Sequence, residues 1–66
     1  MHVIVNGDAT DIPDGFTVTA LLEHLRLRAD RVAIELNSNI LPKDRWPDTY
    51  VHSNDRFEIV QLVGGG

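Results

Sequence analysis

Residues 3–7 read Val-Ile-Val-Asn-Gly, a β-branched run that ends in the strongest short signal for a hairpin. A type I′ turn needs positive φ at both of its central positions, and Asn followed by Gly meets that need. The run therefore predicts two antiparallel strands, at about residues 2–6 and 9–12. Pro13-Asp14-Gly15 then predicts the turn that leads out of the hairpin.

A helix is predicted directly after this turn, over about residues 18–27. Its apolar side chains fall at the spacing of one helical face: Val18, Leu21, Leu22 and Leu25. Thr17 is suited to cap the N-terminus, because its hydroxyl can accept a hydrogen bond from a free backbone N–H group. Phe16, one residue earlier, is placed to pack on Leu21 as a hydrophobic staple.

The second half of the chain contains extended segments separated by turns. Residues 32–36 read Val-Ala-Ile-Glu-Leu, and this alternation predicts a half-buried strand. The other expected features are a turn at 37–39, a short strand at 40–41, at most one helical turn between Pro42 and Pro47, and a final strand over 56–63.

This order of elements predicts an α+β fold. A right-handed crossover would lay the helix over one face of a single mixed sheet, with the first and last strands as central, parallel neighbours. That arrangement is the β-grasp, or ubiquitin-like, fold. We expect one domain over residues 1–63, followed by a flexible glycine tail at 64–66.

The charge balance limits the partners that the chain can bind. The 66 residues include six Lys and Arg against ten Asp and Glu, a net charge of −4 with a pI near 5.0. Nucleic acid and anionic membranes would be repelled, and a basic-faced protein is the natural complement. The densest basic stretch, which contains Arg26, Arg28 and Arg31, is interrupted by Asp30.

The residue types present also limit location and chemistry. Cysteine is absent, which removes disulfides and thiolate chemistry and favours a reducing compartment, so we expect a cytoplasmic protein. No apolar run exceeds three residues, so neither a transmembrane helix nor a secretory signal is expected. The histidines, His2, His24 and His52, lie too far apart to form a motif of metal ligands. We therefore predict neither a catalytic site nor a metal site.

The glycine run at residues 64–66 is the most informative feature. Glycine lacks a Cβ, so Gly64 and Gly65 could thread a narrow channel in a partner enzyme. The only reactive group of such an end is the α-carboxylate of Gly66, which is ionised at pH 7 and resists nucleophiles until it is activated. Adenylation with ATP, carried out by another enzyme, would activate it. The tail would then act as a tethered substrate.

The final strand carries apolar residues on both of its faces. Phe57, Ile59 and Val63 can serve the core, with Gln61 as the exception. Val60 and Leu62 then point to solvent, either as scattered apolar residues or as a docking patch for partners beside the tail. Trp46 is interpreted as packing at the rim of the core, with a partner contact as the alternative.

Several stretches of the chain are similar to one known family. They are the Val5-Asn6-Gly7 hairpin, the Asp14-Gly15 turn with residues 17–22, Val-Ala-Ile-Glu-Leu-Asn at 32–37, residues 41–46, Asn-Asp-Arg-Phe-Glu-Ile-Val at 54–60 and the glycine end at 63–66. On these residues the chain resembles the ThiS family, the sulfur-carrier proteins of thiazole (thiamine) biosynthesis. The glycine end alone is shared by all ubiquitin-like carriers, and the two longer motifs are more specific.

The resemblance implies a mechanism. An E1-like adenylyltransferase of the ThiF type adenylates the Gly66 carboxylate with ATP and magnesium. Sulfur from a persulfide donor converts the acyl-adenylate into a thiocarboxylate, and a thiazole synthase of the ThiG type takes up that sulfur. The carrier would be no enzyme and would hold no cofactor beyond the covalent thiocarboxylate. Gly64 and Gly65 carry over as the thread, and Gly66 as the sulfur site.

Three other interpretations remain open at this point. The molybdopterin-synthase small subunit shares the fold and the glycine end but is usually longer. A carrier for another sulfur pathway, such as cysteine synthesis, is a second. A non-reactive ubiquitin-like binding module is a third, and it would tolerate residues after the glycines.

Overall fold

The computed structural model describes residues 1–62 of the chain. Its strands are β1 (His2–Val5), β2 (Asp8–Asp11), β3 (Val32–Leu36), β4 (Asn39–Ile40) and β5 (Arg56–Gln61). One α-helix, α1 (Val18–His24), and two 3₁₀ segments, Ala29–Arg31 and Lys43–Asp48, complete the described elements. Val63 and the tail at 64–66 lie outside the described residues, so the predicted domain end and the predicted flexibility of the tail stay predictions.

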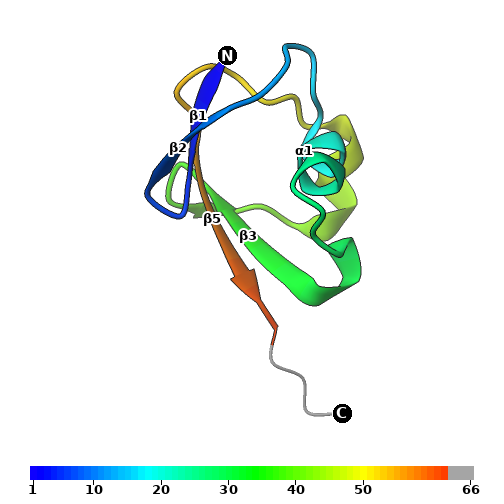
Figure 1. Ribbon diagram of the computed structural model, residues 1–66. Helices are drawn as coiled ribbons and strands as arrows, with labels where there is room; N and C mark the ends of the chain where they lie inside the picture. The colour runs from blue at the N-terminus through cyan, green and yellow to red at the C-terminus, as the bar shows by residue number, and fades with distance from the viewer. Residues whose placement is uncertain (63–66) are drawn as a thin grey trace.

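The strands form one mixed sheet in the order β2-β1-β5-β3-β4 (Figure 1). β1 and β5 are parallel neighbours inside the sheet, with Val5 beside Phe57, and both outer hairpins are antiparallel. Helix α1 lies over one face of this sheet. The predicted β-grasp arrangement is confirmed, including the parallel pairing of the first and last strands.

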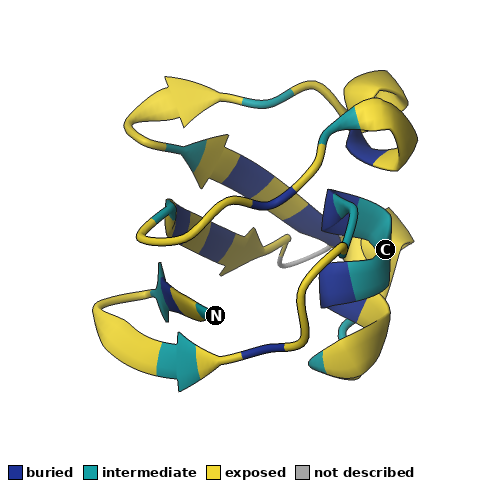
Figure 2. Cartoon of the chain, turned by 90° about the horizontal axis from the view of Figure 1, so that it is seen from above, coloured by how far each residue is buried: buried dark blue, intermediate teal, exposed yellow. Residues whose placement is uncertain are grey.

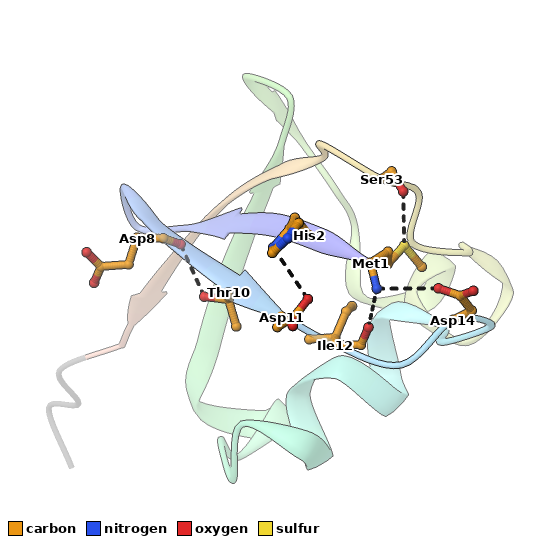
Figure 3. A network of polar contacts seen from close by, with 8 residues as sticks. All are labelled: Met1, His2, Asp8, Thr10, Asp11, Ile12, Asp14 and Ser53. Atoms are coloured by element: carbon orange, nitrogen blue, oxygen red, sulfur yellow. Dashed lines mark hydrogen bonds and ion pairs between the residues drawn. The ribbon is translucent and has the colours of Figure 1, made fainter.

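The N-terminal hairpin has the predicted turn. Asn6 and Gly7 have φ values of 51° and 85°, both positive as a type I′ turn requires, and Val5 pairs with Asp8 across it. The start of β1 is held by polar contacts: the Met1 amino group donates to the Ile12 carbonyl at 2.7 Å and lies 3.4 Å from the Asp14 carboxylate (Figure 3). These contacts join β1 to the segment that leads into α1.

Helix α1 begins as predicted and ends earlier than predicted. The Thr17 hydroxyl accepts a hydrogen bond from the Ala20 N–H group at 3.1 Å, which confirms the cap. The helix ends at His24 rather than residue 27, because Arg26 has a φ of 60° and leaves the helical region. Phe16 is partly buried against the core, and its ring meets that of His24 edge-on, with centroids 5.3 Å apart.

The core lies between α1 and the covered face of the sheet, and buried and exposed residues alternate along β3 and β5 (Figure 2). Its members are Val3, Ile12, Val18, Leu21, Leu22, Val32, Ile34, Trp46, Val51, Phe57 and Ile59. Phe57 and Ile59 were predicted for this face and are buried. Gln61, the predicted exception, is exposed.

Three boundary predictions in the second half were wrong. The short strand covers 39–40 instead of 40–41, because the turn before it has only two residues, Asn37 and Ser38. Strand β5 ends at Gln61. The segment Lys43–Asp48 is longer than one turn, since a 3₁₀ helix has only three residues per turn and here accommodates Pro47.

Trp46 anchors the 3₁₀ segment Lys43–Asp48 to the core. Its side chain is buried, and its indole N–H donates to the Leu41 carbonyl at 2.9 Å. This confirms packing as the role of Trp46 and leaves little of the ring for a partner. Within residues 1–62, no helix is long and apolar enough to cross a membrane.

Candidate functional site

Leu62 is the last described residue before the glycine tail, and we call it the tail root. The Leu62 N–H group donates to the Arg31 carbonyl at 2.7 Å, which extends the pairing of β5 with β3 past the end of the strand. In Figure 1, the arrow of β5 points out of the body of the fold. The predicted site residues Gly64, Gly65 and Gly66 lie outside the described residues.

Val60 and Leu62, the predicted docking patch, are both exposed, at 59% and 51%. They line two separate hollows. Val60 belongs to a hollow of about 180 Å³, which we call the outer hollow and which is lined by Ala33, Ile34, Glu35, Ile40, Glu58 and Val60. Leu62 lines a second hollow with arginine side chains from residues 26–31. The exposure of both side chains is what a docking patch requires, and the docking role itself stays a prediction.

Ile40 is the apolar contributor to the outer hollow that the sequence pattern did not single out. It is 80% exposed, the highest value for a large apolar side chain in the described chain. It sits on β4, the last strand of the sheet, where an apolar side chain in a two-residue strand gives no periodic signal. The sequence offers one signal for this exposure, which is that a strand of two residues is too short to bury its side chains.

The outer hollow has an acidic side. Glu35 on β3 and Glu58 on β5 are directly opposite each other in the strand register, and both are exposed. Like charges in this relation repel each other. Neither carboxylate has an ion-pair partner within residues 1–62, so a cationic group on a partner protein would relieve the repulsion.

The polar residues that could have formed a reactive centre are dispersed. His2 lies 3.4 Å from Asp11 across the pairing of β1 with β2, and His52 lies 4.0 Å from Asp55 in the turn before β5. In the described part of the chain, no group of three or more potential metal ligands comes together.

A family model described as the ThiS family matches residues 3–66. The chain belongs to the ThiS family. The sulfur carrier protein ThiS of Escherichia coli is 32% identical over 66 residues, which span the whole of both chains. The crystal structure of the thiamine biosynthesis protein ThiS from Geobacter metallireducens superposes with a TM-score of 0.86 at 32% identity, again over all of both chains.

A third relative has a different length. A thiazole synthase of Paramagnetospirillum magneticum is 36% identical over 66 residues, which are all of this chain and 20% of that protein. The family model, the Escherichia coli relative and the solved structure agree on a sulfur carrier of thiamine biosynthesis. Among the sulfur carriers that the residues alone left open, these matches select the thiamine branch over the molybdopterin-synthase subunit.

Proposed function

We propose that the carboxylate of Gly66 is the sulfur site and that the chain acts as a co-substrate rather than an enzyme. A carboxylate oxygen attacks the α-phosphorus of ATP, and pyrophosphate leaves. A persulfide sulfur then attacks the acyl carbon, and AMP leaves. A thiol reductant cleaves the S–S bond of the resulting acyl disulfide and leaves the thiocarboxylate. The observation that carries this proposal is the glycine end on a chain of the ThiS family.

The partner enzymes supply the catalytic groups. An E1-like adenylyltransferase of the ThiF type would hold ATP and magnesium, a persulfide enzyme would supply sulfur, and a thiazole synthase of the ThiG type would consume it. The last is supported by the Paramagnetospirillum thiazole synthase, in which a stretch similar to this entire chain occurs within the same polypeptide. The absence of cysteine fits a reducing compartment, and we assign these steps to the cytoplasm.

The fold supports delivery of the tail in two ways. The hydrogen bond from Leu62 to Arg31 fixes the point from which the last residues start, so a docked body brings Gly66 to a defined region of the partner. The exposed side chains Val60 and Leu62 provide apolar contact area at that end of β5, and Ile40 extends this area across the outer hollow. Docking by the body raises the effective concentration of the carboxylate in the partner's active site.

Deletion of Gly66 tests the proposal. The full-length chain, incubated with the adenylating enzyme, ATP and a sulfur donor, should gain the mass of one oxygen-to-sulfur replacement. The truncated chain should gain none, and its thermal melt should match that of the full-length chain, because terminal residues contribute little to stability. A truncated chain that still acquires sulfur would remove Gly66 from its role.

A further inference from the structure

Three arginines gather in a groove beside the tail root. Arg26 and Arg28 follow helix α1, Arg31 ends the 3₁₀ segment Ala29–Arg31, and all three are exposed. Together with Leu27, Gln61 and Leu62 they line a hollow of about 260 Å³, which we call the arginine groove. In a chain with a net charge of −4, this groove concentrates half of the six positive side chains.

Arg26 occupies a position where glycine is usual. Its N–H group donates to the Glu23 carbonyl, and the Leu27 N–H group donates to the Leu22 carbonyl, which together form a Schellman motif. The residue in the left-handed conformation of such a motif is most often glycine, because a Cβ is strained there. A long cationic side chain held in this conformation, with a φ of 60°, suggests a role outside the fold.

The charge of the groove comes from two of its three arginines. Arg28 donates two hydrogen bonds to the Asp30 carboxylate, at 3.2 and 3.0 Å. These bonds hold the pKa of Asp30 below its usual value, and the two opposite charges offset each other within the groove. Arg26 and Arg31 have no ion-pair partner within residues 1–62 and leave about two positive charges unbalanced.

The groove is tied to the tail root through the backbone. The Arg31 carbonyl accepts the hydrogen bond from Leu62. One residue therefore contributes a cationic side chain to the groove and holds the backbone of Leu62, the last of the described residues. Leu27 and Leu62 add apolar surface between the guanidinium groups. A ligand seated here lies beside the start of the tail.

We propose that the arginine groove binds an acidic surface segment, carrying Asp or Glu side chains, on the enzymes that receive Gly66. The proposal rests on the function proposed above. Guanidinium groups pair with carboxylates through two parallel hydrogen bonds, and the leucines fit the apolar atoms of a protein segment better than a free phosphate. The acidic pair Glu35 and Glu58, on the neighbouring outer hollow, has the opposite sign and would set the orientation of docking.

Charge reversal tests the groove against a matched control. Arg26→Glu combined with Arg31→Glu changes the net charge by the same amount as Lys43→Glu combined with Arg45→Glu, and all four side chains are exposed outside the core. Lys43 and Arg45 line neither the arginine groove nor the outer hollow. Binding to purified thiazole synthase and to the adenylating enzyme is measured at low and high salt. We expect the groove variant to bind at least about tenfold more weakly at low salt, chiefly through a slower association rate, and the control to stay within about twofold.

The proposal is overturned if both double variants weaken enzyme binding equally. It is also overturned if neither variant weakens enzyme binding. Arg26→Gly and Arg26→Lys sharpen the result. The glycine variant should melt at a higher temperature yet bind the enzymes more weakly. The lysine variant keeps the charge but not the two parallel hydrogen bonds, so its affinity should fall between those of the original chain and the glycine variant. A glycine variant that binds like the original chain contradicts a role for the Arg26 charge.

A titration with inorganic phosphate distinguishes a small-anion site. Backbone NMR shifts at Arg26 and Arg31 that saturate at low millimolar phosphate, with enzyme binding unaffected in the groove variant, would assign the groove to a free anion instead. If the original chain binds neither enzyme, the proposed function fails as well. If it binds both and loses nothing in the groove variant, only the groove proposal fails.

Discussion

Asn6 clamps Ile59 on the neighbouring strand with both atoms of its side-chain amide. Its Oδ1 accepts a hydrogen bond from the Ile59 N–H group at 2.7 Å, and its Nδ2 donates to the Ile59 carbonyl at 3.1 Å. The backbone N–H group of Asn6 already bonds to Phe57 at 2.8 Å. The side chain therefore continues the parallel pairing of β1 and β5 by one step after the β1 backbone has turned away.

Replacing Asn6 tests this clamp. Asn6→Ala should lower the free energy of unfolding by about 1 to 2 kcal/mol, because the polar groups of Ile59 lose their partners. Asn6→Gly removes the same two bonds but relieves the positive φ of 51°. The glycine variant should therefore be the more stable of the two in urea unfolding. Equal stability of both variants and the original chain would mean that the clamp contributes nothing.

The turn between β3 and β4 offers a matched pair of changes. Asn37 and Ser38 have φ values of 52° and 73°, so this hairpin uses the same turn type as Asn6-Gly7 but with serine in the second position. Ser38→Gly should raise the free energy of unfolding by about 0.5 kcal/mol, since the relief of left-handed strain exceeds the added freedom of the unfolded chain.

The reverse change is the control. Gly7→Ser places a side chain at a φ of 85° in a site where an added Cβ meets no atom within 4 Å, so strain is its only cost. Thermal melts of the two variants should shift in opposite directions. A stabilising Gly7→Ser would contradict the turn assignment.

Because the carboxylates of Glu35 and Glu58 lie opposite each other, reversing one of the two charges should stabilise the fold. Glu35→Lys replaces repulsion by attraction across the strands and should raise the free energy of unfolding by about 0.5 kcal/mol at low salt. Glu35→Gln removes the repulsion alone and should give a smaller gain. Both gains should shrink in high salt, because exposed charges are screened. Urea unfolding at two salt concentrations measures the effect.

Most of the fold was predictable because its signals lie between near neighbours in the sequence. The Asn6-Gly7 turn, the Thr17 cap and the alternation of Phe57 and Ile59 each follow from spacing of a few residues, and the structure confirms all three. The order of elements then leaves few ways to pair β1 with β5.

The remaining features depend on tertiary contacts, which the spacing of residues along the sequence does not indicate. No glycine marks the end of α1, so the left-handed conformation of Arg26 was not foreseen and the helix was predicted too long. The dual role of Asn6 was missed because its place in the turn already explained the residue. The arginine groove joins residues 26–31 to residues 61 and 62, and only the tertiary structure brings these two stretches together.

Substitution of the exposed residues Val60 and Leu62 should weaken docking to the partner enzymes and leave the fold intact. Val60→Asp and Leu62→Asp each remove an apolar contact and place a charge in the outer hollow or the arginine groove. We expect each variant to bind thiazole synthase and the adenylating enzyme more weakly by about 1 to 3 kcal/mol, as for residues at the centre of an interface. Their free energies of unfolding should stay within about 0.5 kcal/mol of the original, because surface changes rarely cost more.

Tyr50→Asp is the matched control for the docking variants. Tyr50 has the same exposed fraction as Val60, 59%, but lines neither hollow. The Tyr50→Asp variant should therefore bind thiazole synthase and the adenylating enzyme with unchanged affinity in titration calorimetry. Ile40→Asp should behave like Val60→Asp, since both side chains line the outer hollow. If Tyr50→Asp weakens binding as much as the docking variants do, added negative charge rather than a specific surface explains the losses. If Leu62→Asp unfolds the chain, Leu62 contributes to the core instead.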